Sequence, residues 1–270
     1  AAVSLNGGQP RYYDCLPENG FIPDPEQIRS LIGPKTRAIV VINPNNPSGA
    51  VYGTDTLREI AAIAAANDLV LLADEIYDQM VYDEAEFVPM ATLAGEGVCV
   101  TFSGLSKVYR ACGYRVGWCV FSGNLEAARE YTHGMELLAA LRLCANVPGQ
   151  WAVQTALGGF QSIHELVQPG GRLYQQRQVV IDRVAASQYL DLHKPMGAMY
   201  AFIRLDDRFA GKLDDRGFAQ ELLEDKHVLV APGSSFNTPY TDHFRITTLP
   251  DVDTLHLVFD RVDELLAAHA

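Results

Sequence analysis

The fold is decided by residues 101–120, which read T-F-S-G-L-S-K-V-Y-R-A-C-G-Y-R-V-G-W-C-V. A hydrophobic, strand-like run at 98–102 ends there in a turn of small residues, and Lys107 follows this turn directly. Arg115 lies eight residues further on, between Gly113 and Gly117, and leads into another strand-like run. A lysine at the end of a buried strand lies where a parallel sheet presents side chains to a ligand.

Lys107 and Arg115 together indicate a particular chemistry. Burial favours the neutral amine of a lysine, which is the form that makes Schiff bases with carbonyl compounds. An arginine nearby offers the forked pair of donors that suits a phosphate group. A Schiff-base lysine with a phosphate anchor predicts pyridoxal 5'-phosphate as the cofactor.

Composition excludes several other classes of protein. The 270 residues are 48% hydrophobic and 20% charged, which is typical of a globular chain of one large or two smaller domains. The net charge of -12 argues against a nucleic-acid partner or an anionic membrane surface. No apolar run approaches the ~20 residues that span a bilayer. Five cysteines at scattered spacing predict neither a disulfide framework nor a metal site, and favour a cytoplasmic location.

Strands and helices alternate through the first part of the chain. We expect a strand, a turn and a strand in residues 1–20, a helix capped by Asp24 through residue 32, and a helix that starts at Thr54. Residues 37–42 and 69–73 read as strands, the former buried on both faces. Longer helices are predicted at 124–143 and 145–158. The pattern predicts an α/β fold with a largely parallel sheet.

The C-terminal part follows a different pattern. After a linker at 168–171 we expect helices at 172–187, 217–225 and 253–268, and strands at 200–205, 228–231 and 243–248. This order is typical of an α+β unit. We therefore predict a large domain at residues 1–170 and a small domain at residues 171–270.

Polar groups follow three successive strands, namely Asn46, Asp74 and Lys107. Each alone has an ordinary explanation, as a turn former, a cap or a solvated surface group. At successive strand ends they fit one cofactor: Asp74 keeps the pyridine nitrogen protonated, and Asn46 and Tyr77 donate to the ring's phenolate oxygen. Lys107 forms the Schiff base and then moves the proton, and Arg245 clamps a substrate carboxylate.

Several motifs resemble those of the class I aminotransferases of the aspartate aminotransferase fold, pyridoxal fold type I. They are N-P-N-N-P-S-G at 43–49, A-D-E-I-Y at 73–77 and S-K-x-Y-x-x-x-G-x-R-x-G-W at 106–118. Longer stretches at 135–148, 154–159, 169–174 and 242–250 resemble the bacterial glutamate–pyruvate (alanine) branch. The resemblance implies a three-layer large domain, a homodimer, and roles for Asn46, Asp74, Tyr77, Lys107, Arg115 and Arg245 in binding the cofactor or the substrate.

The sequence departs from the family pattern in two ways. Many relatives carry a serine three residues before the lysine, where this chain has Gly104, so Ser103 or Ser106 would have to replace it; we assign Ser106 to the phosphate. The second departure is at the start, because family members have about a third of their chain before the position that matches residue 1. That part carries a phosphate-binding turn and the aromatic side chain that stacks on the ring. We therefore expect this chain alone to bind the cofactor weakly.

The leading interpretation is transfer of an amino group between L-alanine and 2-oxoglutarate. An alternative is a transaminase or lyase of the same fold with another amino acid, since the motifs serve the cofactor and the α-carboxylate. A third reading is a non-catalytic remnant. G-x-S-x-G, G-x-x-x-x-G-K-[ST] and G-x-G-x-x-G are all absent from the sequence, which argues against hydrolase and nucleotide-binding readings.

Overall fold

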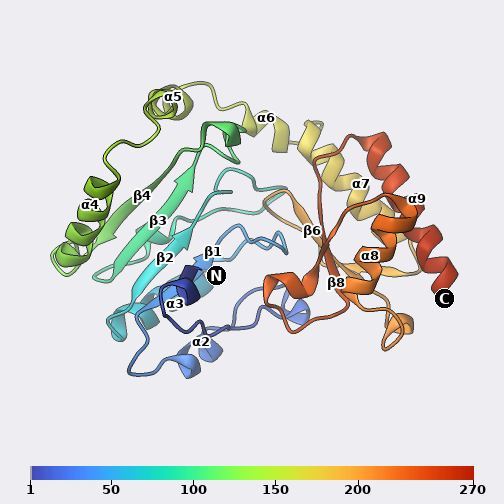
Figure 1. The fold of residues 1–270 in the computed structure, drawn as a ribbon, viewed down its shortest axis with the longest axis horizontal. Coiled ribbons are helices and arrows are strands. Elements are labelled where there is room, and N and C mark those ends of the chain that lie inside the picture. Colours follow the sequence, from blue (N-terminus) through green and yellow to red (C-terminus); the bar gives the residue numbers. More distant parts are fainter. Residues whose placement is uncertain (1) are drawn as a thin grey trace.

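Two four-stranded sheets lie side by side in the computed structural model, which describes residues 2–270 (Figure 1). The first sheet has the order β1-β2-β3-β4, with β1 (Ala38–Ile42), β2 (Val70–Asp74), β3 (Val98–Gly104) and β4 (Gly117–Gly123). Strands β1, β2 and β3 are parallel, and β4 runs antiparallel to β3. The mostly parallel sheet predicted from the sequence is confirmed.

The parallel register brings three strand ends into line. Ile42 pairs with Asp74, and Asp74 pairs with Phe102. The residues that follow these strands therefore emerge at the same edge of the sheet. That edge faces the second half of the molecule in Figure 1.

Helix α3 (Thr54–Ala66) covers one face of this sheet, because its apolar side chains recur at helical spacing. Leu57, Ile60 and Ala64 are buried in a core that they share with β1, β2 and α2 (Pro25–Leu31). The side chain of Asp24 accepts a hydrogen bond from the backbone N–H of Glu26 and caps α2, as the sequence predicts.

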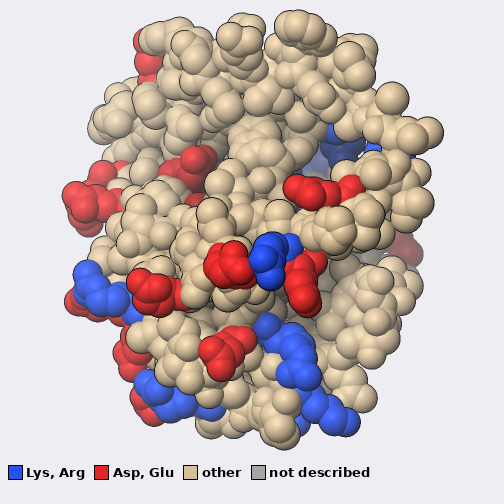
Figure 2. Space-filling view, turned by 90° about the vertical axis from the view of Figure 1, so that its left-hand side faces the viewer, with Lys and Arg blue, Asp and Glu red and all other residues tan. Residues whose placement is uncertain are grey.

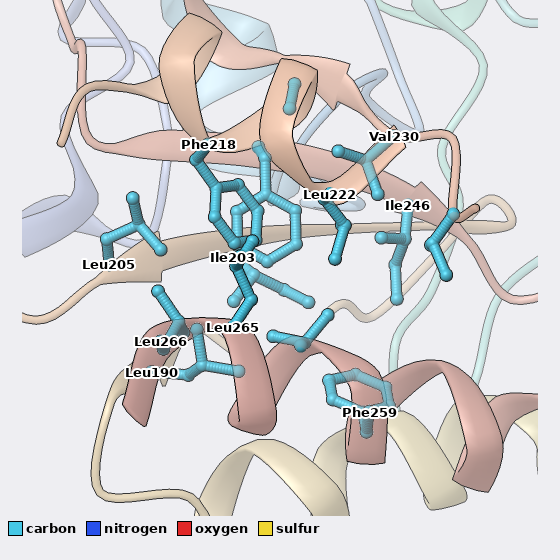
Figure 3. Packing of buried hydrophobic residues seen from close by; sticks show 14 of the residues in the cluster. Leu190, Ile203, Leu205, Phe218, Leu222, Val230, Ile246, Phe259, Leu265 and Leu266 are labelled. Carbon is cyan, nitrogen blue, oxygen red and sulfur yellow. The ribbon is translucent and has the colours of Figure 1, made fainter. Parts of the chain in front are cut away.

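The second sheet is antiparallel and has the order β5-β6-β8-β7, with β5 (Leu190–Leu192), β6 (Tyr200–Leu205), β7 (Ala231–Pro232) and β8 (His243–Thr247). Side chains of β6 alternate between two environments. Ala201, Ile203 and Leu205 pack in one core with α7 (Arg172–Ala186), α8 (Asp215–Lys226) and α9 (Val252–His269), part of which Figure 3 shows. Tyr200 and Phe202 belong to the clusters of the other face, toward the first sheet.

Three helices connect the two halves: α4 (Arg129–Arg142), α5 (Val147–Gly158) and α6 (Ile163–Val167). Helices α4 and α5 lie at the outer rim of the first sheet in Figure 1. They expose large apolar side chains, among them Leu141 at 81% and Trp151 at 75%, and Leu143, which follows α4 directly, is 86% exposed. Figure 2 views this side and shows a broad uncharged area in its upper part, where α5 lies.

The remaining elements are short. They are α1 (Ala2–Leu5) and the 3-10 turns Pro17–Asn19, Met90–Thr92, Cys112–Tyr114, Asp207–Phe209 and Gly233–Phe236. Within residues 2–270 no helix is long and apolar enough to cross a membrane.

Three expectations about secondary structure and one about burial were wrong. Residues 2–5 form a helical turn and residues 8–16 have no regular secondary structure, so the strand–turn–strand predicted at 1–20 is absent from residues 2–20, and residue 1 lies outside the described part of the chain. Val40 of β1 is 46% exposed, because α3 covers only one face of this edge strand. The helix predicted at 124–143 begins only at Arg129, after a turn. The strand predicted at 228–231 shrinks to Ala231–Pro232, because residues 228–230 have no pairing partner in the sheet.

The two sheets are joined by tight backbone packing just before β6. Gly49 accepts hydrogen bonds at its carbonyl from the N–H groups of Met196 and Gly197. A Cβ atom on Gly49, whose φ is +72°, would lie 2.5 Å from Pro195 Cβ, and one on Gly197 would lie 2.7 Å from Pro44 Cβ. Only glycine fits at these two positions. The loop after β1 and the start of β6 therefore lie in direct contact.

A buried ion pair reinforces this junction. The guanidinium of Arg177, on α7, donates to Asp83 over 2.8 Å and to the carbonyl of Pro195 over 2.6 Å. Burial acts to raise the pKa of Asp83, but hydrogen bonds from Lys194 and Arg177 outweigh it and lower the pKa to about 2. Asp83 therefore stays ionised and holds α7 to the segment that follows β2. The division into domains at 1–170 and 171–270 stays a prediction.

Candidate active site

The polar residues predicted from the strand ends converge where the two sheets meet. Asp74 ends β2, Asn46 lies in the loop after β1, and Lys107 follows the turn after β3. From the second sheet, β8 brings Arg245 to the same place, where its guanidinium contacts Asn46. The structure therefore groups residues that are far apart in the sequence.

Lys107 and Tyr77 lie next to each other at the centre of this group. The Nζ atom of Lys107 is 5.9 Å from the centroid of the Tyr77 ring. Tyr77 is only 3% exposed, and burial raises the pKa of its hydroxyl well above the ordinary value. The Tyr77 hydroxyl therefore keeps its proton and can act as a hydrogen-bond donor.

Asp74 is half-buried, and its carboxylate faces two opposing influences. Burial raises the pKa of Asp74, whereas the backbone N–H of Ile76, 3.3 Å from its Oδ1 atom, and the charge of Lys107 lower it. The net pKa lies above the ordinary value, because burial dominates. A carboxylate held in such a place is stabilised by any cation or N–H donor that arrives beside it.

Arg245 is held on three sides. Its Nη1 atom donates to Asn46 Oδ1 over 2.8 Å, and its Cζ atom lies 4.5 Å from the ring centroid of Tyr200 and 4.7 Å from that of Phe236. Its Nε atom is buried and has no hydrogen-bond partner among the described residues. A buried donor without an acceptor is costly, so this edge of the guanidinium is suited to an anionic ligand.

Arg115 stands apart from the others. It follows the turn Cys112–Tyr114 with a φ of +52°, and its side chain is exposed. Within the described chain, the only hydrogen bond of this side chain runs from Nη1 to the carbonyl of Cys112 over 2.9 Å. The remaining donors of its fork are therefore available for another acceptor.

The turn before Lys107 explains the absence of a serine at position 104. A Cβ atom on Gly104 would lie 2.8 Å from the carbonyl oxygen of Val116 and 3.1 Å from the Cα atom of Gly117. Strand β4 thus packs too closely to admit a side chain. Ser106 is half-buried in the following turn, and its hydroxyl makes no hydrogen bond among residues 2–270.

Three residues of this region were missed by sequence reasoning. Tyr200 and Phe236 pack against Arg245, which lies well after Tyr200 and nine residues after Phe236 in the sequence. Glu75 is buried beside Asp74 and accepts a hydrogen bond from the N–H of Met90 over 2.7 Å; burial raises its pKa to about 7. No local pattern marks Tyr200 or Phe236, because aromatic residues on strands and turns are ordinarily core residues.

Comparison with known proteins identifies the family. A family model described as aminotransferase class I and II matches residues 1–261. The chain belongs to this family. Members of the family use pyridoxal phosphate, as the sequence predicted, and the α/β fold type I architecture is confirmed by the structural matches below.

Individual relatives are similar along the whole chain. Glutamate-pyruvate aminotransferase AlaA of Escherichia coli (strain K12) is 45% identical over 269 residues, which cover 100% of this chain and 66% of the relative. An aminotransferase from Escherichia coli superposes with a TM-score of 0.95 at 45% identity, covering 98% of this chain and 66% of that one. Alanine aminotransferase from Pyrococcus furiosus superposes with a TM-score of 0.91 at 34% identity, covering 98% and 66%. The chain thus spans just under two thirds of the length of these aminotransferases.

The grouped residues fit pyridoxal phosphate. The cofactor needs an amine, an acid for its ring nitrogen and donors for its ring oxygen. Lys107, Asp74 and Tyr77 offer these groups side by side. Because Asn46 uses its Oδ1 atom to accept from Arg245, its amide N–H groups remain free to donate.

Proposed function

We propose that this chain is part of an enzyme that transfers an amino group between L-alanine and 2-oxoglutarate. The observation that carries this proposal is the convergence of Lys107, Asp74, Tyr77, Asn46 and Arg245 between the two sheets. The choice of alanine is supported by the names of two relatives, a glutamate-pyruvate aminotransferase and an alanine aminotransferase.

Each of these residues has a role in the proposed reaction. When bound, pyridoxal phosphate supplies an aldehyde for Schiff-base formation and a ring that accepts electrons from the substrate. Lys107 takes the proton from the α-carbon of the amino acid and returns one during the second half of the transfer. Asp74 keeps the ring nitrogen protonated. Pairing with this cation lowers the pKa of Asp74, which burial has raised.

Other side chains bind and orient the two ligands. Tyr77 and Asn46 donate hydrogen bonds to the ring oxygen. Arg115, whose fork is largely unoccupied, and Ser106 bind the phosphate group. Arg245 binds the α-carboxylate of the amino acid, which would give its buried Nε atom the acceptor that it lacks.

The test is to add pyridoxal phosphate at saturating concentration to the purified chain and to follow its absorbance. We expect a band in the near-ultraviolet to blue, and we expect L-alanine to shift it to the spectrum of the aminated cofactor. Conversion by another amino acid but not by alanine supports the alternative of a transaminase or lyase with another substrate. Absence of the band under saturating cofactor would contradict a site that binds the cofactor through Lys107. It would support the reading of the chain as a non-catalytic remnant.

We also propose that two copies of this chain associate through α4 and α5. The exposed apolar side chains of this region are Leu137, Leu138 and Leu141 on α4, Leu143 directly after α4, and Trp151 on α5. Exposed apolar patches mark interfaces. α5 carries no charged residue, so it can pack against a second copy without burying a charge. Analytical ultracentrifugation should give the mass of a dimer at micromolar concentration, and Leu141→Asp with Trp151→Ser should give a folded monomer. A parent chain that sediments as a monomer at this concentration would contradict the proposal.

All five cysteines are free thiols, which supports the cytoplasmic location expected from their spacing.

A further inference from the structure

Tyr200 connects two residues of the candidate site that do not contact each other directly. It begins β6 and is 6% exposed. Its hydroxyl oxygen lies 2.9 Å from the hydroxyl oxygen of Tyr77, and the two rings meet edge to face with centroids 5.7 Å apart. Its ring face lies against the guanidinium of Arg245, 4.5 Å from Cζ.

The strand register sets this position. Tyr200 pairs with Thr247 across the second sheet, and Phe202 pairs with Arg245. Tyr200 is thus the diagonal neighbour of Arg245 on the same face, a distance that aromatic and long side chains can bridge. The segment just before Tyr200 also packs on the junction, where Ala198 donates from its N–H to the carbonyl of Met80.

We propose that Tyr200 is a positioning residue for the amino transfer, an inference that rests on the function proposed above. Its hydroxyl supports the hydrogen bond that Tyr77 donates to the cofactor ring. Its aromatic face holds the Arg245 guanidinium in the orientation that binds the substrate carboxylate. One side chain thereby serves both the cofactor half and the substrate half of the site.

The first role follows from counting protons. Each tyrosine hydroxyl has one proton, so a Tyr77 that donates to the cofactor ring has none to give to Tyr200. Tyr200 must then donate to Tyr77 across the 2.9 Å contact. Hydrogen bonds in such a chain polarise one another, so Tyr77 becomes the stronger donor.

The second role follows from the packing of Arg245. Tyr200 and Phe236 each lie within 5 Å of its Cζ atom, and Asn46 binds its Nη1 atom. With the guanidinium plane held in this way, the N–H groups of Nε and Nη2 are left to bind the ligand. Cation–π contacts of desolvated guanidinium groups are strong enough to matter for affinity.

Two substitutions at position 200 separate the two roles. Tyr200→Phe keeps the aromatic face and removes the hydroxyl, whereas Tyr200→Leu removes both. The matched control is Tyr82→Phe, because Tyr82 is also buried, also uses its hydroxyl in a 2.9 Å hydrogen bond, and also packs on an arginine, namely Arg177. Arg245→Ala and Tyr77→Phe serve as references.

The carboxylate role is measured without cofactor, by titrating the chain with propionate, which has the carboxylate of alanine but not its amino group. Tyr200→Leu should raise the Kd about 3- to 10-fold, as expected for loss of a cation–π contact. Tyr200→Phe and the Tyr82→Phe control should stay within about twofold of the parent. Arg245→Ala should abolish the binding. Equal Kd values for the parent and Tyr200→Leu would overturn this half of the proposal.

The hydroxyl role is measured by the pH midpoint of the absorbance change of the bound cofactor. A donor to the ring oxygen stabilises its deprotonated form, so weakening that donor moves the midpoint to higher pH. Tyr200→Phe should raise the midpoint by a few tenths of a unit, less than Tyr77→Phe does, and should add nothing when Tyr77 is already Phe. A midpoint for Tyr200→Phe that stays at the parent value would overturn the role of the Tyr200 hydroxyl. An equally large shift in Tyr82→Phe would overturn it too.

Failure of the proposed function is recognised separately. If the parent chain shows no cofactor band, the proposed function fails, while propionate binding still decides the role of Tyr200 toward Arg245. Thermal unfolding of the cofactor-free proteins then tests whether the hydroxyl groups of Tyr77 and Tyr200 interact. The double substitution of Tyr77 and Tyr200 by Phe should lower the Tm no more than the larger single effect, whereas additive effects would overturn the contact.

Discussion

Replacing Lys107 by alanine is expected to remove the near-ultraviolet to blue band of the cofactor and to abolish its conversion by L-alanine. The amine of Lys107 is the group beside Tyr77 that can form a Schiff base with the aldehyde. The same amine is the base for the α-proton, and loss of a positioned base slows proton transfer by at least about 100-fold. Absorbance spectra and single-turnover mixing with L-alanine measure both losses.

Lys212→Ala is the control for this experiment, because Lys212 is an exposed lysine in the second half of the chain. It should leave both the band and the conversion at the level of the parent. A band that persists in Lys107→Ala would show that another amine binds the cofactor. In that case the assignment of Lys107 as the catalytic residue would be wrong.

Arg245→Ala is expected to weaken binding of the amino acid by about 100-fold while leaving the cofactor band unchanged. Removing one partner of a buried charge pair costs about 2–5 kcal/mol. A 100-fold rise in Kd corresponds to about 2.7 kcal/mol, which lies within this range. The band should persist because Arg245 contacts Asn46 and two aromatic rings, and none of its contacts is to Lys107. Titration of the cofactor spectrum with an amino acid gives the Kd.

Two further variants show whether the fork of Arg245 matters. Arg245→Lys keeps the charge and loses the paired donors, so we expect affinity between that of the parent and that of Arg245→Ala. Arg216→Ala, an exposed arginine on α8, should bind the amino acid as the parent does. Loss of the cofactor band in Arg245→Ala would assign this residue to the cofactor instead of the substrate.

Sequence reasoning succeeded where a local pattern carries the information. Strands β1 and β2 consist largely of continuous apolar runs, and β3 begins with one. The parallel register brings the polar residues at or after the ends of these strands to one edge of the sheet. The helix that starts at Thr54 shows the spacing of an amphipathic helix, and Asp24 with Pro25 marks the start of another. These features depend on neighbours within a few residues.

Sequence reasoning failed where the local structure depends on contacts with residues distant in the sequence. The apolar alternation near residue 3 predicts a strand, but no other strand lies beside it, so the backbone satisfies its hydrogen bonds in a helical turn. Val40 belongs to an apolar run, yet its exposure is set by which face α3 covers. Gly104 departs from the family pattern because β4 approaches it closely, which only the packed sheet reveals.

The sequence by itself determined the family, the strand ends and the identity of the groups that follow them, because these reside in contiguous motifs. Only the tertiary structure decided how the site is completed. Arg245 reaches Asn46 across 199 residues, and Tyr200 reaches Tyr77 across 123. Both contacts exist because glycines at 49 and 197 let the loop after β1 pack directly on the start of β6. Contacts of this kind depend on how two separate sheets dock, a geometry that no local pattern encodes.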